Sequence, residues 1–245
     1  VSQRGDAVAQ FFNITNLEHI ENASELISQG EIIIAGFNGV FGIFGDADCP
    51  EAIAKILEAK NRPVDKNLIL VSPPEFLYEH LNLSATVFQY HPLEKIKQLY
   101  QEIHALGMIL PAAVPGAPYH LVREGTILNI WTEYPPHQPI RKLVLALRNR
   151  GKRALVGTSA NKSGQPTFTC ATQVVEAFND DVAAVLSDSF EHLPAVRRKS
   201  TTIVDFTGEY PRLYREGSVP ESELREHIER LGFRKLIVDE NVIKV

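Results

Sequence analysis

Cysteine is scarce in this chain, and long hydrophobic runs are missing. Cys49 and Cys170 are the only two cysteines among 245 residues, too few for a disulfide framework, and neither has CxxC metal or redox spacing. No apolar stretch approaches the roughly 18–20 residues that a helix needs to cross a bilayer. The first residues, 1–6, lack the charged-then-apolar pattern of a signal peptide. We therefore expect a cytoplasmic protein in a reducing compartment, with no membrane partner.

The commonest motifs for phosphate, zinc, nucleophile and dinucleotide sites are also absent. The chain has no GxxxxGK[ST], HExxH, GxSxG or GxGxxG pattern. Its eight histidines are scattered and show no pair at ligand spacing, so we expect no metal site built by the protein. The formal net charge of −5 argues against a surface that binds nucleic acid broadly, although a local basic patch stays possible.

The sequence does contain short apolar runs that alternate with amphipathic stretches. Runs with the length and flanks of central strands are Ile32–Ile34, Leu68–Val71, Met108–Leu110, Ile127–Ile130, Ala154–Val156, Ala183–Leu186 and Thr202–Val204. Apolar residues at helical spacing predict helices over Pro50–Lys60, Leu93–Leu106, Ile140–Arg148, Ala171–Phe178 and Glu221–Leu231. Ser218 is the expected cap of the last helix, and Gly232 its expected end. The alternation predicts an α/β sheet flanked by helices.

Two basic residues follow the first predicted helix. Lys60 and Arg62 stand one residue apart before Pro63, and from an extended segment both could face one polyphosphate. Basic residues also complement the negative end of a helix. The pair alone leaves both interpretations open.

A turn rich in hydroxyl, amide and glycine groups follows the strand predicted for 154–156. It runs from Gly157 to Gly164 and includes Ser159 and Asn161. Open α/β sheets bind ligands at this end of their strands, where exposed N–H groups can cradle phosphate oxygens. A turn that caps the next helix would use the same residue types.

A third polar segment begins at Ser200 and closes at Gly217. Its first three residues carry hydroxyls, and Arg212 and Arg215 follow later, three residues apart. These groups could extend an anion site, although most surface arginines are simply solvated.

In this order, the three segments resemble the YrdC family, which includes threonylcarbamoyl-AMP synthases and the carbamoyl-adenylate-forming domains of larger carbamoyltransferases. The matching segments are Lys60–Pro63 (KxRP), Thr158–Gly164 (TSANxSG), Ser200–Asp205 (STIVD) and Leu213–Gly217 (REG). The resemblance covers about 24–219 and implies one domain over 1–245, with a C-terminal helix and tail in 220–245. It also implies a twisted, mainly parallel open sheet flanked by helices, with a large concave site.

The resemblance implies an ATP-dependent nucleotidyltransferase. In the family reaction, bicarbonate and an amino acid form a carbamate, whose carboxylate attacks the α-phosphorus of ATP and releases pyrophosphate. The implied nucleotide-binding residues are Lys60, Arg62, Ser159, Asn161, Ser200 and Arg215, of which Lys60 and Arg62 are the catalytic pair. Mg²⁺ is expected to bridge the phosphates and needs no protein cage of its own. A downstream carbamoyl-transferring enzyme would receive the product, so contact with tRNA would be indirect.

Three segments depart from the family pattern, and the resemblance assigns all three to the amine side of the site. PTDTVYGL corresponds to 36–43, PGPxT to 115–119 and RxP to 131–135, where the expected hydroxyls, carboxylate and arginine are missing. The predicted substrate-pocket residues are Phe37, Asn38, Gly39, Phe41, Tyr119 and Trp131. A site that hydrogen-bonds a hydroxyl selects strongly for it. The departures predict an amine other than threonine, or a ready-made carbamoyl donor; the alternative is a shifted alignment with threonine still used.

A binding module without turnover is the other class of function that the sequence allows. The cleft of the family is basic and concave, and this chain has a local basic set for double-stranded RNA: Lys152, Arg153, Arg197, Arg198 and Lys199. The presence of the residues assigned to the phosphates, Lys60, Arg62, Ser159, Asn161 and Arg215, favours nucleotide binding over a fold that binds no nucleotide.

Overall fold

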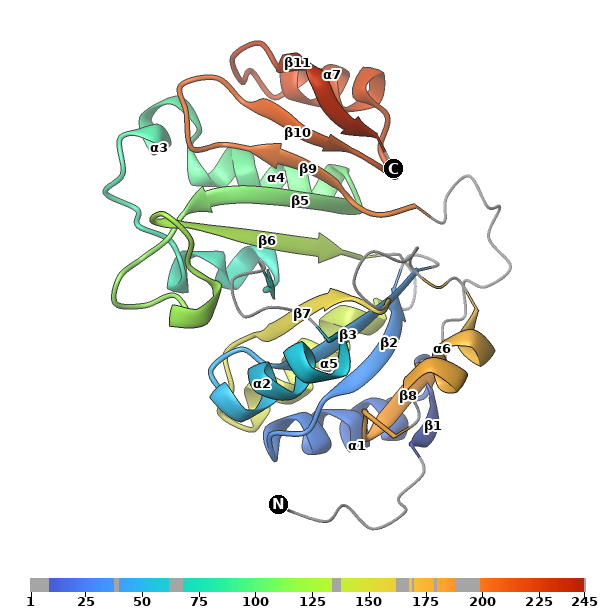
Figure 1. Cartoon of the computed structure of the whole chain (residues 1–245). Coiled ribbons are helices and arrows are strands. Elements are labelled where there is room, and N and C mark those ends of the chain that lie inside the picture. The colour runs from blue at the N-terminus through green and yellow to red at the C-terminus, as the bar shows by residue number, and fades with distance from the viewer. Residues whose placement is uncertain are drawn as a thin grey trace. The chain divides into compact units, whose positions relative to one another are not determined.

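The computed structural model describes residues 9–37, 40–61, 68–133, 138–161, 168, 170–178, 180–187 and 199–244. The chain divides into two compact units, each assembled from two stretches of sequence (Figure 1). Unit 1 comprises Val1–Leu68 with Tyr134–Arg198, and unit 2 comprises Ile69–Glu133 with Lys199–Val245. The single domain expected over 1–245 stays a prediction.

The described part of unit 1 contains a sheet with the strand order β1-β8-β2-β3-β7. Its strands are β1 (Gln10–Asn13), β2 (Ile33–Phe37), β3 (Val40–Asp46), β7 (Leu155–Ser159) and β8 (Ala184–Ser187). β8 pairs in parallel with β1 and β2, whereas β3 is antiparallel to β2 and β7. The carboxyl ends of β1, β8, β2 and β7 therefore share one edge of this sheet.

Helices accompany this sheet: α1 (Leu17–Ser28), α2 (Pro50–Ala59), α5 (Pro139–Asn149) and α6 (Ala171–Phe178). Asn16 begins α1 by accepting a hydrogen bond from Glu18 N at 2.9 Å, a usual N-cap arrangement. α1 packs against α5, while α2 packs on β3. Because α2 follows β3 and returns over it, the residue that ends α2 lies back near the start of β3.

The ring of Phe44, a residue of β3, packs over Gly42 of the same strand and Gly157 of β7. Phe44 is 5% exposed, and a Cβ at Gly42 or Gly157 would lie only 2.5 or 2.6 Å from its ring. Gly157 stands directly opposite Phe44 in the β3–β7 ladder. Close packing therefore requires these two glycines, because any side chain there would displace the ring.

The described part of unit 2 contains a sheet with the strand order β4-β6-β5-β9-β10-β11. Its strands are β4 (Ile69–Val71), β5 (Ala105–Pro111), β6 (Thr126–Thr132), β9 (Thr202–Asp205), β10 (Arg212–Glu216) and β11 (Ile237–Lys244). The pairs β4–β6, β5–β9 and β10–β11 are parallel, and β5–β6 and β9–β10 are antiparallel. Its helical segments are η1 (Pro74–Glu79), α3 (Val87–Tyr90), α4 (Leu93–Glu102), η2 (Tyr119–Leu121) and α7 (Glu221–Arg230).

A buried amide joins β4 to β6. Asn129 is fully buried; its Oδ1 accepts from Ser72 N at 2.9 Å and its Nδ2 donates to Ser72 O at 3.2 Å. The side chain thus bonds both backbone groups of Ser72, as a neighbouring strand would. Tyr100 donates its hydroxyl to Asn129 O at 3.1 Å, and burial raises the pKa of that phenol.

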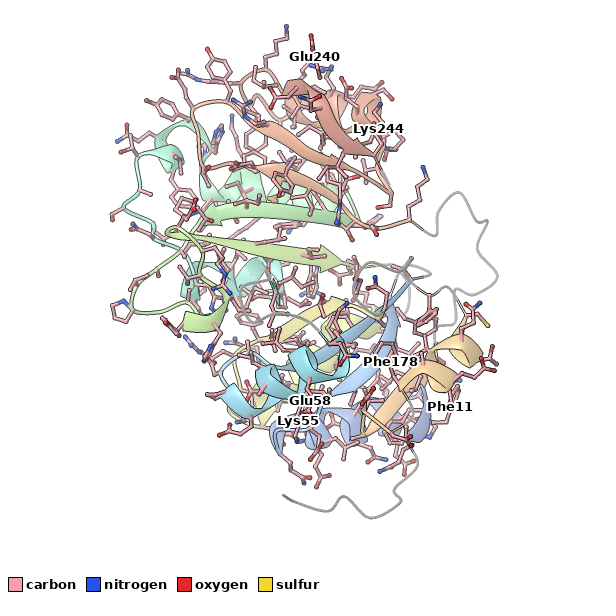
Figure 2. The ribbon with its side chains drawn as sticks, in the orientation of Figure 1. Phe11, Lys55, Glu58, Phe178, Glu240 and Lys244 are labelled. Atoms are coloured by element: carbon pink, nitrogen blue, oxygen red, sulfur yellow. The ribbon has the colours of Figure 1, made fainter. Side chains whose placement is uncertain are left out.

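The C-terminal segment adds α7 and the outer strand β11 to unit 2, and Figure 2 shows the side chains of Glu240 and Lys244 on β11. Ser218 does not cap α7, so that prediction is wrong; its buried Oγ finds no partner among the described residues. Glu216 instead caps the start of α7, because its Oε1 accepts a hydrogen bond from Glu221 N at 3.0 Å. This hydrogen bond lowers the pKa of the Glu216 carboxyl. Gly232 follows the helix with a left-handed φ of 67°, as predicted.

The predicted fold class, α/β with a largely parallel sheet flanked by helices, is confirmed. Each run predicted as a strand overlaps a strand of the structure. The helix predicted for 93–106 is too long: Ile103 is extended, with φ −106° and ψ 106°, and the chain continues as β5. In the described ranges, no helix has the length and apolar character needed to span a membrane.

Candidate nucleotide site

Two of the sequence motifs meet at the carboxyl-end edge of the unit 1 sheet. β7 ends at Ser159, and Lys60 is the C-cap of α2. They meet although 99 residues separate them, because α2 returns over β3 and β3 pairs with β7. Open α/β sheets bind their ligands at this edge.

Lys60 is a buried cation, with only 2% of its surface exposed. Its Nζ donates to Ser159 O and to Asn161 Oδ1, the latter at 3.0 Å, and lies 3.5 Å from Ser159 Oγ. These three acceptors are uncharged oxygens, which replace part of the water around the buried ammonium. The arrangement is suited to a negatively charged ligand at the strand ends.

Ser159 and Asn161 are tied to each other as well as to Lys60. Ser159 Oγ donates to Asn161 Oδ1 at 2.5 Å, so this amide oxygen accepts from both the hydroxyl and the ammonium. The Ser159 residue is exposed while Lys60 is buried. The cluster therefore joins an exposed serine to a buried cation 3.5 Å from its hydroxyl oxygen.

This set of donors fits phosphate oxygens. An ammonium is a compact charge with three donors, and a serine hydroxyl rotates to suit its partner. Both groups have uncharged acceptors that a phosphate could replace. Within the part of the chain that the structure describes, no three His, Cys, Asp or Glu side chains gather in a metal-binding group.

Phe41, a predicted pocket residue of unit 1, contacts the residue after Ser159 through its backbone. Phe41 is 1% exposed, its O accepts from Ala160 N at 2.8 Å, and its N donates to Phe168 O at 3.2 Å. Phe37 ends β2, but its side chain is outside the described part. Three other predicted site residues lie outside the described residues: Asn38, Gly39 and Arg62.

Tyr119 and Trp131 belong to unit 2. Tyr119 is 83% exposed in η2, and its ring makes an edge contact with His120 at 5.2 Å between centroids. Trp131 lies on β6 with no exposed surface and donates from Nε1 to Glu133 Oε2 at 3.1 Å. Trp131 is thus a core residue of its unit, and the substrate-pocket role of both aromatics stays a prediction.

Ser200 and Arg215 also belong to unit 2, where they lie around one turn. Arg215 donates from Nε and Nη2 to Thr201 O at 3.1 and 2.8 Å. Ser200 O accepts from Ser218 N at 2.9 Å. Burial lowers the pKa of the Arg215 guanidinium, which remains a cation at neutral pH because the ordinary pKa is above 12.

The sequence analysis did not single out Thr202, which the structure places at the centre of that turn. Its buried hydroxyl bonds the backbone of Gly217 and Val219. A run of three hydroxyl residues at 200–202 was the available signal. Nothing in sequence spacing tells which of the three hydroxyls points inward.

The basic set proposed for RNA is partly neutralised within unit 1. Lys152 Nζ pairs with Asp46 Oδ2 at 2.8 Å, and Arg153 Nη2 pairs with Asp48 Oδ1 at 2.6 Å. Arg197 and Arg198 lie outside the described residues. The described contacts therefore give the RNA interpretation no added support.

Comparison with known proteins gives the family to which the chain belongs. The family model Sua5_yciO_yrdC, described as "Telomere recombination", matches residues 25–217. The chain therefore belongs to this YrdC-like family, whose curated relatives are nucleotidyltransferase-type enzymes.

Two curated relatives of the chain have the same name, threonylcarbamoyl-AMP synthase. The threonylcarbamoyl-AMP synthase of Vibrio campbellii is 31% identical over 179 residues, covering 69% of this chain and 86% of the relative. The threonylcarbamoyl-AMP synthase of Bacillus subtilis is 27% identical over 229 residues, covering 93% of this chain and 61% of the relative.

Solved structures share the fold. P. abyssi Sua5 complexed with L-threonine matches with a TM-score of 0.73 and 23% identity, over 95% of this chain and 62% of that one. E. coli YciO matches with a TM-score of 0.68 and 19% identity, over 88% of this chain and 98% of that one. The chain spans less than two thirds of the P. abyssi protein's length.

Proposed function

We propose that this chain binds ATP and joins it to a carbamate made from bicarbonate and an amine, releasing pyrophosphate. The observation that carries the proposal is the buried Lys60 ammonium, held with Ser159 and Asn161 at the carboxyl ends of the strands. The names of the curated relatives support the same reaction type.

The chemistry asks little of the protein beyond alignment and charge. The carbamate carboxylate is itself the nucleophile: its oxygen bonds to the α-phosphorus as the bond to pyrophosphate breaks. Lys60 and Ser159 would donate to the phosphate oxygens on which charge accumulates. Two charge-assisted hydrogen bonds of about 1.5–3 kcal/mol each correspond to roughly two to four powers of ten in rate. Mg²⁺, held by the phosphates, would supply further neutralisation.

Ligand binding at Lys60 would involve a local exchange of hydrogen-bond partners. Its Nζ donates to two oxygens of the 159–161 turn, Ser159 O and Asn161 Oδ1. A phosphate oxygen that replaces one of these acceptors would leave the other in place. The hydrogen bond from the ammonium to the phosphate would be charge-assisted on both sides.

The remaining nucleotide residues are proposed from the motifs. Arg62 and, in unit 2, Ser200 and Arg215 are assigned to ATP by the family resemblance. Arg62→Ala is expected to remove pyrophosphate release while the thermal melting curve stays unchanged. Full release by a folded Arg62→Ala variant would exclude the role given to Arg62.

The amine is proposed to differ from threonine, or to be replaced by a ready-made carbamoyl donor. The altered segment 36–43 supports this, because the positions of the family's hydroxyls and carboxylate now carry Phe37, Asn38 and Gly39. Threonine use with a different alignment is the alternative.

The deciding experiment measures pyrophosphate release with ATP, Mg²⁺, bicarbonate and a panel of amino acids and other small amines. Release with an amine other than threonine is expected. Robust release with threonine alone would refute the changed specificity. ATP binding without release under any condition would favour the binding module, and thermal shifts with ATP·Mg²⁺ against short duplex RNA would identify its ligand.

A further inference from the structure

Thr202 stands at a buried hydrogen-bond junction in unit 2. It is the first residue of β9 and has no exposed surface. Its Oγ1 accepts from Gly217 N at 2.9 Å and from Val219 N at 3.0 Å, and donates to Val219 O at 2.7 Å. One hydroxyl therefore satisfies three backbone groups of the turn that follows β10, using its full bonding capacity.

The two residues before Thr202 bond the same stretch of chain. Ser200 O accepts from Ser218 N at 2.9 Å, and Thr201 O accepts from the Arg215 guanidinium. Gly217 has no room for a side chain, because a Cβ there would overlap Ser200 O. Each of residues 200, 201 and 202 thus makes a hydrogen bond to the segment 215–219.

This joining fixes the plane of the Arg215 guanidinium. Nε and Nη2 both donate to Thr201 O, at 3.1 and 2.8 Å, and a planar fork with two bonds to one oxygen has little freedom to rotate. The direction of that oxygen depends on the peptide between Thr201 and Thr202, which the Thr202 hydroxyl anchors. The remaining N–H groups of Arg215 then have set directions for an anion.

We propose that Thr202 is a positioning residue that acts on ATP only through Arg215. The inference rests on the proposed function, because it takes Arg215 as an ATP-binding group. Replacing Thr202 with valine keeps the shape but leaves Gly217 N, Val219 N and Val219 O without their partner. The turn then shifts, and Arg215 loses its fixed acceptor.

The first measurement follows Arg215 itself and needs no ligand. Solvent exchange of the Arg215 Nε–Hε group, observed by ¹⁵N NMR, is slow when Thr201 O is held in place. Thr202→Val is expected to speed this exchange by about tenfold or more, and Thr202→Ser, which keeps the hydroxyl, to stay within about threefold of wild type. Unchanged exchange in a folded Thr202→Val variant overturns the proposal.

The second measurement is ATP affinity by titration calorimetry in the wild-type and Arg215→Ala backgrounds. Thr202→Val is expected to weaken ATP binding about tenfold in the first background and to have no further effect in the second. Equal weakening in both backgrounds would mean that Thr202 only stabilises the unit, which overturns the proposal. Thr207→Val is the matched control: its hydroxyl bonds Asp205 Oδ1 at 2.7 Å, just beyond the other end of β9, and ATP affinity should not change.

The outcomes separate this inference from the proposed function. Wild-type protein that fails to bind ATP refutes the function, while the exchange measurement still decides whether Thr202 positions Arg215. If Thr202→Val does not fold, Thr202→Cys carries both measurements, because a thiol makes weaker hydrogen bonds in nearly the same volume. Its effects should have the same direction and a smaller size, and their absence overturns the inference.

Discussion

Two basic side chains, one in each unit, are held in opposite ways. Lys60 of unit 1 is 2% exposed and donates to uncharged oxygens, whereas Arg212 of unit 2 pairs with Asp239, both side chains being 53% exposed. Burying a charge costs free energy, while an exposed pair gains little. The comparison teaches that burial of Lys60 is costly, which agrees with the phosphate ligand proposed for it, whereas the exposed Arg212–Asp239 pair requires no ligand.

The largest expected effect is on catalysis, from Lys60→Met. Pyrophosphate release should fall about 100- to 1000-fold, because one preorganised charged donor is lost, while the melting temperature stays the same or rises. Lys55→Met is the control, because Lys55, which lies on α2 and is labelled in Figure 2, forms an ion pair with Glu31 at 2.9 Å. This variant should keep release within about twofold of wild type. Equal losses in both variants would remove the distinction between a buried and a solvated lysine.

Gly217→Ala should cause the largest loss of stability in unit 2. A Cβ at Gly217 overlaps Ser200 O, which is itself bonded to Ser218 N, so the backbone must shift. We expect the free energy of unfolding to fall by about 2–4 kcal/mol in urea titrations. Gly208→Ala is the control, because the nearest atom to its Cβ is Tyr210 O at 3.8 Å. A neutral Gly217→Ala would show that the turn is not held tightly.

Asn129→Leu tests whether buried neutral hydrogen bonds matter as much as buried charge. The substitution leaves Ser72 N and Ser72 O without a partner inside unit 2. The free energy of unfolding should fall by about 2–3 kcal/mol, measured by urea denaturation. Asn82→Ala, on an exposed turn, should cost about 1 kcal/mol or less. A result for Asn129 no larger than for Asn82 would contradict the assigned role.

A buried histidine should make unit 2 sensitive to mild acid. Burial between Phe206 and Phe233 lowers the pKa of His91, against a bond to Gly208 O that raises it. In the unfolded chain the imidazole is protonated near pH 6.5, whereas in the folded chain protonation requires a lower pH. The contribution of His91 to the free energy of unfolding is therefore fully present above pH 6.5 and is lost as the pH falls below it. Between pH 7.5 and 5.5 the free energy of unfolding should fall by up to about 1 kcal/mol. His91→Phe should flatten this slope, measured by urea denaturation at both pH values, and an unchanged slope would contradict the role given to His91.

The smallest expected effect is that of Arg212→Ala. Its pair with Asp239 is exposed, so the free energy of unfolding should change by about 0.2–0.5 kcal/mol, and less at high salt. A double-mutant cycle with Asp239→Ala measures the pair directly. A coupling above about 1 kcal/mol would contradict the view that this pair is merely solvated.

Sequence reasoning located the strands that are continuous apolar runs and missed others, among them the exposed β11 and the buried, glycine-containing β3. β11 contains Asp239, Glu240 and Asn241 in sequence and is exposed along most of its length, so no apolar run marks it. β3 contains Gly42 and Gly45, which lower its strand propensity. Gly42 leaves room for the ring of Phe44 on the same strand, and Gly45 leaves room for Ala52 and Ile56 of α2. α1 had a usable signal, an asparagine cap before Ile20, Ala23 and Ile27 at helical spacing, which the analysis passed over.

The candidate site was predictable in its residue types and not in its contacts. The pattern of a helix end followed by Lys60, and of a strand end followed by Ser159 and Asn161, was readable in the sequence. Their contact depends on the antiparallel placement of β3 between β2 and β7, which no local pattern specifies. The Thr202 junction depends in the same way on the β9–β10 pairing.

Because the Phe44 ring packs on Gly42 and on the distant Gly157, substitutions at these three positions should depend on one another. A larger residue at 42 or 157 is tolerable only after the phenyl ring has gone, and loss of the ring alone leaves a void between two glycines. Relatives with a small residue at 44 should therefore carry side chains at the other two positions, and the three should covary across the family.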